Sequence, residues 1–162
     1  MRPDWSVVLV GPEYIEQEED RESNVVEWLL KLKKLQNVYL IGYQPKKNLP
    51  EWIAQFDVCI VPYKISYKLV RYCNPMKLYE YLACGKPVVA TNILALREID
   101  QLGIKIASSA NEFIKHIEYF LDNWNVQKAC AVKSMITKHN WEQRVSWIEQ
   151  EIIKRNNYLL SV

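Results

Sequence analysis

The sequence contains few of the residues that build common catalytic and metal-binding motifs. It has two histidines, His116 and His139, and neither has cysteines or carboxylates at the spacing of a metal ligand set. Its four glycines form neither a G-x-G-x-x-G fingerprint nor a G-x-S-x-G elbow. We therefore expect no metal site, no conventional dinucleotide-binding site and no hydrolase built on a nucleophile elbow.

Cysteine pairs and long apolar runs are also missing. Cys59, Cys73, Cys84 and Cys130 show no C-x-x-C or C-x-x-H spacing, and each lies in or beside an apolar segment, which is typical of buried, reduced thiols. No apolar stretch approaches the roughly 18 residues of a membrane span, and none follows the N-terminus as in a signal peptide. These features predict a soluble, cytoplasmic protein, with peripheral contact at the inner face of a membrane left open.

An excess of charge of one sign is absent as well. The chain has 21 lysines and arginines against 19 acidic residues, a formal net charge of +2, so the bulk balance does not indicate nucleic-acid binding. With 49% hydrophobic and 25% charged residues, the composition is that of a globular protein. A chain of 162 residues is the size of one domain and buries about two thirds of its unfolded surface.

Strands and helices alternate through the first two thirds of the chain. Apolar runs predict strands at residues 5–11, 37–43, 57–63, 87–91 and 104–108. Helical spacing predicts helices at residues 24–35, 48–56, 110–124 and 126–138, and a last helix that starts at Asn140 with Gln143 placed for a capping box. This order predicts an α/β fold with a Rossmann-like, doubly wound parallel sheet. We expect that domain at residues 1–138 and a C-terminal helix at residues 139–162.

One stretch, "NPMKLYEYLACGKPVVAT", combines a helix with a strand and starts at Asn74. Asn74 is a good N-cap, Pro75 is a good first helical residue and Gly85 is a good terminator, so the helix should end near Cys84. It follows the third strand, and open α/β sheets bind ligands at the carboxyl ends of their strands. The amino end of this helix should therefore face a ligand crevice.

Lys77 and Glu80 share one face near that amino end. Free amides and the positive end of the helix dipole stabilise an anion by typically about 0.3–1 kcal/mol, and Lys77 adds a cation where a diphosphate would lie. The carboxylate of Glu80 suits a vicinal diol such as a ribose. The alternative is a surface ion pair between Lys77 and Glu80, worth about 0.2–0.5 kcal/mol. Helix physics leaves both interpretations open.

The same stretch resembles the nucleotide-sugar-binding segment of GT-B glycosyltransferases, in particular glycosyltransferase group 1, or family 4. That group carries a P-x-K-x-x-E-Y-x-A-x-G-K-P-V-V pattern in its C-terminal half. The order of "DWSVVLVGP", "NVYLIGY", "LPEWIAQFDVCIVPY" and "HNWEQRVSWIEQEI" agrees, so the resemblance covers nearly the whole chain. It implies the C-terminal half of a GT-B fold with a donor site for a nucleoside diphosphate sugar.

The resemblance also gives particular residues a role. Glu80 matches the glutamate that binds the ribose hydroxyls, and Lys77 lies in the segment beside the diphosphate. Gly42 and Tyr43 follow the strand whose loop receives the base. The complete set of expected substrate-binding residues is Gly42, Tyr43, Pro62, Tyr63, Tyr72, Asn74, Pro75, Met76, Lys77, Leu78 and Glu80. No catalytic residue is assigned.

Two departures from the family pattern stand out. Tyr72 replaces a glutamate that contacts the donor sugar in many members, so the resemblance does not identify the sugar. Tyr67, Lys68 and Arg71 lie in the same loop and could substitute for that glutamate. The chain also resembles only the C-terminal domain, without its usual first strand and helix. We therefore expect an incomplete fragment, inactive alone, whose terminal helix packs toward a missing N-terminal acceptor-binding domain.

For the whole enzyme, the resemblance implies a retaining hexosyltransferase in polysaccharide biosynthesis that needs no metal or other cofactor. It would transfer a sugar from a nucleoside diphosphate sugar to a glycan, a lipid or another hydroxyl acceptor. The alternative is a non-catalytic Rossmann-like nucleotide-binding or interaction module, which Tyr72 favours. The unmatched strand further predicts that strands 5–11 and 57–63 pair directly, or that a second chain fills the gap by self-association.

Overall fold

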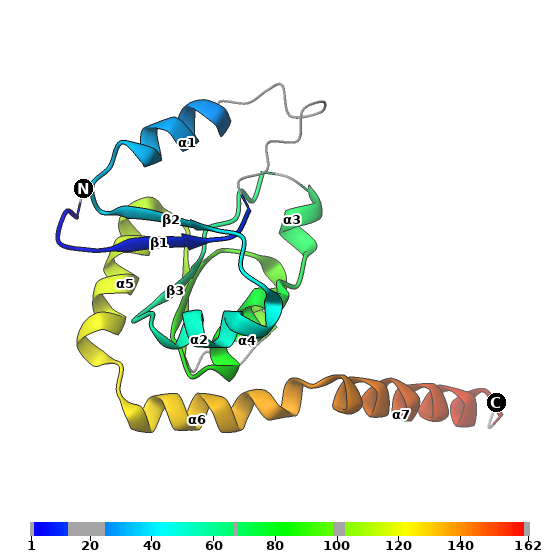
Figure 1. Cartoon of the computed structure of the whole chain (residues 1–162). Coiled ribbons are helices and arrows are strands. Elements are labelled where there is room, and N and C mark those ends of the chain that lie inside the picture. The colour runs from blue at the N-terminus through cyan, green and yellow to red at the C-terminus, as the bar shows by residue number, and fades with distance from the viewer. Residues whose placement is uncertain (1, 13–24, 67, 99–102, 161–162) are drawn as a thin grey trace. The chain divides into compact units, whose positions relative to one another are not determined.

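The computed structural model of the chain describes residues 2–12, 25–66, 68–98 and 103–160 (Figure 1). It divides into two compact units, Met1–Leu49 and Pro50–Val162. No helix within these described ranges is long and apolar enough to cross a bilayer.

The first unit contains a two-stranded parallel sheet. β1 (Val7–Val10) pairs with β2 (Val38–Gly42), and the register shifts after Leu9. α1 (Val25–Lys33) lies between the two strands in sequence, as a parallel pair requires a crossover. The short 3-10 helix η1 (Lys46–Asn48) follows β2.

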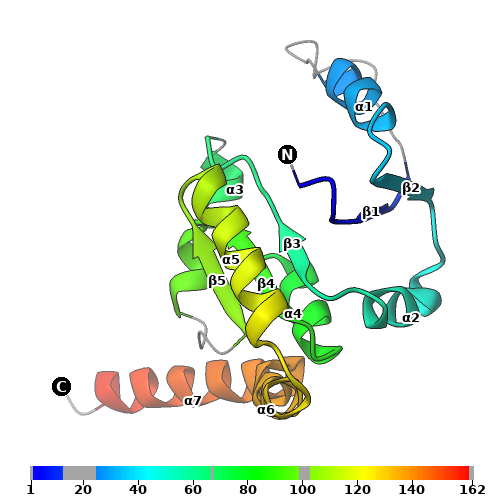
Figure 2. The same ribbon diagram turned by 90° about the vertical axis from the view of Figure 1, so that its left-hand side faces the viewer.

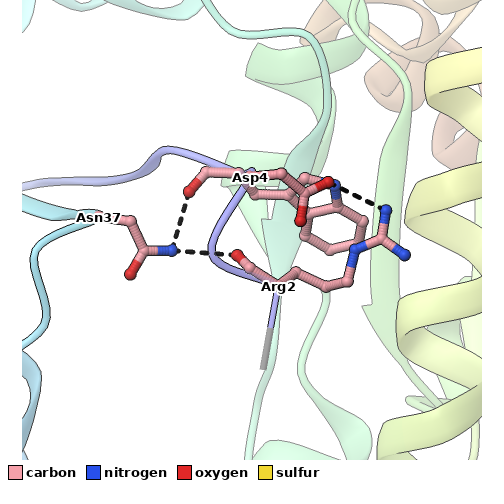
Figure 3. A network of polar contacts seen from close by, with 4 residues as sticks. Arg2, Asp4 and Asn37 are labelled. Atoms are coloured by element: carbon pink, nitrogen blue, oxygen red, sulfur yellow. Dashed lines mark hydrogen bonds and ion pairs between the residues drawn. The ribbon is translucent and has the colours of Figure 1, made fainter.

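A small polar network anchors the start of β1 in this unit (Figure 3). The Asn37 side chain donates hydrogen bonds to the carbonyls of Arg2, at 3.1 Å, and Trp5, at 2.8 Å. Arg2 in turn pairs with Asp4 at 3.1 Å and lies 4.8 Å from the centre of the Trp5 ring. Because Asn37 directly precedes β2, these bonds connect the segment before β1 to the start of β2.

The second unit contains a three-stranded parallel sheet in the order β3-β4-β5. The strands are β3 (Cys59–Val61), β4 (Val88–Thr91) and β5 (Ile104–Ala107). Val88, Val89 and Ala90 of the central strand are fully buried, so β4 forms the middle of the core. Such a continuously apolar strand is typical of a parallel sheet covered on both faces.

Helices surround this second sheet (Figure 2). α4 packs on β3, β4 and α6, whereas α5 packs on β4 and β5. α7 contacts η3 and projects from the rest of its unit. The bounds are α2 (Leu49–Ala54), α3 (Lys68–Tyr72), α4 (Met76–Ala83), η2 (Leu94–Glu98), α5 (Ala110–Asn123), α6 (Val126–Ile136), η3 (Thr137–His139) and α7 (Trp141–Leu160).

The predicted α/β fold with parallel strands is confirmed, and its strands fall into two sheets. β1 is assigned to the sheet of the first unit and β3 to that of the second. The prediction that strands 5–11 and 57–63 pair directly, or that a second chain fills the gap, stays a prediction. The sequence interpretation also missed α3, because a helix of five residues is too short to show an apolar periodicity.

The four cysteines are free thiols in unlike surroundings. Cys59 is buried, Cys73 and Cys84 are partly buried, and Cys130 is exposed. The prediction of a buried thiol is therefore correct for Cys59 and wrong for Cys130. Cys130 lies on the outer face of α6, because Val132 and Ile136 of that helix turn inward.

Burial of Cys59 and Tyr81 should make the protein sensitive to alkali. Burial raises the pKa of Cys59 from 9.0 to about 12 and that of Tyr81 from 10.0 to about 12. A raised pKa in the folded state means that the contribution to stability is complete below the unfolded pKa and is lost as the pH rises toward the folded one. We expect the free energy of unfolding to fall from about pH 9 upward.

Urea unfolding at several alkaline pH values would measure this fall. Cys59→Ala should flatten the fall above pH 9, and Tyr81→Phe should flatten the part above pH 10, because each removes the titrating group. Cys130→Ala, at an exposed site, is the control and should leave the slope unchanged. Equal slopes in the parent and both test variants would contradict the assignment.

Two glycines of the second unit should differ in their tolerance of alanine. Gly85 and Gly103 have φ values of +75° and +81°, so alanine costs about 1–2 kcal/mol of strain at either position. At Gly85 the new Cβ meets the movable end of Lys133, whereas at Gly103 it meets Val132 at 2.8 Å and Trp124 at 3.1 Å inside the core.

We expect Gly103→Ala to destabilise the unit by about 1–3 kcal/mol more than Gly85→Ala, since overpacking adds to the strain. Urea denaturation of the two variants beside the parent chain measures the difference. A Gly85→Ala variant that is as unstable as Gly103→Ala would show that Lys133, or Ala129 at 3.3 Å, cannot move aside.

Candidate functional site

The amino end of α4 lies at the carboxyl edge of the three-stranded sheet. β3 and β4 run parallel, and α4 leads from the segment after β3 to the start of β4. A helix in such a connection starts at the edge where the first strand ends, and open α/β sheets bind ligands at that edge.

Packing determines which face of α4 points outward. Leu78 and Leu82, one helical turn apart, are fully buried. Lys77 is exposed and Glu80 is partly exposed. The helix therefore presents its leucines to the sheet and to α6, and it leaves a cation and a carboxylate accessible near its amino end.

Three later helices of this unit satisfy their amino ends with their own side chains. Ser109 accepts a hydrogen bond from the Glu112 amide at 3.2 Å, before α5. Asn125 and Asn140 do the same for α6 and α7, at 3.0 Å and 2.8 Å. The bond from the Gln143 amide to Asn140 is one of the two bonds of the predicted capping box, and it confirms Asn140 as the N-cap.

The amino end of α4 is built differently. Pro75 occupies its N-cap position with φ −68° and ψ 117°, so it has no side-chain cap, and the first turn contains no acidic residue. The Pro75 carbonyl accepts a hydrogen bond from the Leu78 amide at 3.1 Å. The amides of Met76 and Lys77 have no acceptor among the residues that the structure describes, so they are available to an anion.

The prediction that Asn74 caps this helix is wrong. The extended ψ of Pro75 delays the helix to Met76, one residue later than predicted, and makes Pro75 the N-cap residue. The Asn74 side chain donates instead to the hydroxyl oxygen of Tyr79, at 3.0 Å. The same oxygen accepts a hydrogen bond from Arg144 at 2.9 Å.

The alternative role for Lys77 and Glu80 was a surface ion pair. Within the described parts of the chain, neither residue forms an ion pair with the other or with a third residue. The surface ion pair is thus not what the structure shows. Both charged groups remain available to a ligand.

Comparison with known proteins identifies the family. The sequence pattern of the family described as "Glycosyl transferases group 1" matches residues 1–123. This chain belongs to the glycosyl transferases of group 1.

Two similar proteins illustrate the family. A Bacillus subtilis (strain 168) protein, TuaH, named as a teichuronic acid biosynthesis glycosyltransferase, is 38% identical over 93 residues, which are 57% of this chain and 21% of TuaH. The crystal structure of Anabaena Alr3699/HepE in complex with UDP matches 96% of this chain with a TM-score of 0.58 and 19% identity. The chain spans 42% of that second protein. These likenesses support the fold predicted from the GT-B resemblance.

In this group 1 chain, the other predicted site residues lie after strands or at helix ends. Pro62 and Tyr63 directly follow β3, and the exposed Tyr72 ends α3. Gly42 and Tyr43 belong to the first unit, where Gly42 ends β2 with φ +74° and its carbonyl accepts a hydrogen bond from the Gly11 amide at 3.0 Å. Gly11 was not predicted, although a strand ending in glycine marks both positions.

The loop before α4 is described only in part. Tyr67 lies outside the described residues, and Lys68 and Arg71 fall within α3. Near the site, Glu80 and Tyr63 add to the rise in the pKa of Tyr81, after the larger effects of burial and of Cys59.

A separate cavity of about 390 Å³ lies at β5 and α5, with Lys105, His116, Tyr119 and Trp124 among its lining residues. None of the predicted substrate-binding residues lines this cavity. The described residues also contain no group of three or more histidines, cysteines and carboxylates arranged to hold a metal ion. The amino end of α4 is thus the place where the predicted residues of the second unit and the free amides coincide.

Proposed function

We propose that this chain is the donor-binding part of a glycosyltransferase and that it binds the nucleoside diphosphate of a sugar donor at the amino end of α4. The observation that carries this proposal is the uncapped helix end, where Lys77 and Glu80 form no ion pair with any residue that the structure describes. Membership of glycosyl transferases group 1 supports the reaction class, and the UDP in the Anabaena structure supports the ligand class.

The chemistry follows from the groups at the helix end. The amides of Met76 and Lys77 would donate hydrogen bonds to phosphate oxygens, and the Lys77 ammonium would balance their charge. As the bond to the sugar breaks, negative charge grows on the leaving diphosphate, and the same donors stabilise it. One turn along the helix, the Glu80 carboxylate would accept hydrogen bonds from the ribose hydroxyls. These groups supply the positive charge without requiring a metal.

The similar proteins support a more specific proposal for the sugar, the acceptor and the pathway. The whole protein would transfer a hexose with retention to a hydroxyl acceptor in polysaccharide biosynthesis, since TuaH is named for the synthesis of such a polymer. Acceptor binding would belong to a part of the protein outside this chain. A non-catalytic nucleotide-binding module is the second candidate, favoured by Tyr72, which is 68% exposed where many family members carry a glutamate.

Isothermal titration with UDP and GDP tests the site. Removing a charge-assisted hydrogen bond costs about 1.5–3 kcal/mol, so Glu80→Ala should weaken binding roughly tenfold or more, and Lys77→Ala should weaken it in the same direction. Glu142→Ala and Lys115→Ala remove exposed charges on α7 and α5 and serve as matched controls. If both test variants bind as tightly as the controls, the site is misplaced.

A transfer assay tests whether this chain binds the nucleotide but lacks transfer activity by itself. We expect the 162-residue chain to bind UDP but to transfer no sugar from UDP-hexoses to oligosaccharide or lipid acceptors, because positioning of the acceptor supplies several kcal/mol of catalysis. UDP binding by the same preparation controls for folding. Formation of a glycosylated product by the chain alone would contradict the expectation.

A further inference from the structure

Three side chains meet at the Tyr79 hydroxyl in the second unit. Its oxygen accepts hydrogen bonds from the amide of Asn74, at 3.0 Å, and from the guanidinium of Arg144, at 2.9 Å. Asn74 precedes the uncapped end of α4, and Arg144 lies in the first turn of α7. A single hydroxyl thus links the entrance of the proposed nucleotide site to the terminal helix.

Arg144 is held in this position from several sides. Its guanidinium carbon lies 5.2 Å from the centre of the Tyr79 ring and 5.8 Å from that of Trp141. The ring of His139 lies 6.0 Å from Tyr79. Between residues 140 and 150 Arg144 alone is partly buried and all the others are exposed. Arg144 therefore connects the start of α7 to Tyr79 of α4.

We propose that Tyr79 and Arg144 are positioning residues of the nucleotide site. Through the Tyr79 hydroxyl, α7 holds Asn74 in place, and Asn74 sets the direction in which the chain enters α4. Because Pro75 provides no side-chain cap, the bond from Asn74 to Tyr79 restrains the approach to the free amides of Met76 and Lys77. This inference rests on the proposed function and adds that α7 controls the affinity of the donor site.

Tyr79→Phe separates positioning from packing, because it keeps the ring and its contacts and removes only the shared hydroxyl. The loss of one or two hydrogen bonds should weaken UDP binding about threefold to tenfold. Arg144→Met should weaken binding similarly, and Arg144→Lys should restore part of it. Because both residues act through the same hydroxyl, the Tyr79→Phe, Arg144→Met double variant should bind UDP little worse than either single variant.

The measurements are isothermal titration with UDP, thermal melts, and hydrogen exchange of the Met76 and Lys77 amides in the presence of UDP, with Tyr119→Phe on α5 as the matched control. Positioning predicts weaker binding and faster exchange of these two amides in the UDP complex, with little change in melting temperature. A purely structural role predicts a lower melting temperature with unchanged UDP affinity, and that result would overturn the proposal.

Glu80→Ala in the same series distinguishes failure of the proposed function from failure of the positioning role of Tyr79 and Arg144. A parent chain that binds no UDP refutes the proposed function, and the positioning role falls with it. If the parent binds UDP and Glu80→Ala weakens it, while Tyr79→Phe and Arg144→Met bind as the parent does, only the positioning role is refuted.

Discussion

Burial of Leu78 and Leu82 fixes the orientation of α4, and the accessible groups of the proposed site follow from that orientation. Each fully buried leucine contributes about 1.5–3 kcal/mol, which exceeds the few tenths of a kcal/mol that a surface pair of Lys77 and Glu80 would add. The helix therefore cannot rotate to favour its charged side chains. Its apolar packing determines that Lys77 and Glu80 face outward at the carboxyl edge of the sheet.

α4 and α5, which both start at this edge, have opposite electrostatics at their amino ends. The first turn of α5 is closed by Ser109 and by Glu112, whose carboxylate accepts a hydrogen bond from the Ser108 amide at 2.8 Å. That carboxylate would repel an anion. α4 has no side-chain cap, which would typically add about 1 kcal/mol to the stability of the helix, and its first amides stay free. The local chemistry of this edge thus favours α4 over α5 as the place for an anion.

The sequence predicted the order of the strands and long helices because each carries its own apolar period, and the observed ends differ by one or two residues at most positions. The features that the sequence could not predict depend on contacts between residues that are far apart along the chain. Asn74 fits the local rule for an N-cap, but its side chain donates instead to the Tyr79 hydroxyl, which also accepts a hydrogen bond from Arg144. The exposure of Cys130 depends on which face of α6 packs, and the division into two sheets depends on strand pairing.

The way in which α7 is attached explains why loss of the Tyr79 hydroxyl should affect UDP binding more than folding stability. The start of α7 is stabilised by the Asn140 cap, and its later part carries a pair between Lys154 and Glu151 at 2.8 Å. These interactions are local to the helix and do not involve α4. The body of α4 is fixed by its buried leucines, so we expect both helices to stay folded without the Tyr79 hydroxyl. The freedom gained should be confined to the entry segment around Asn74, next to the free amides of Met76 and Lys77.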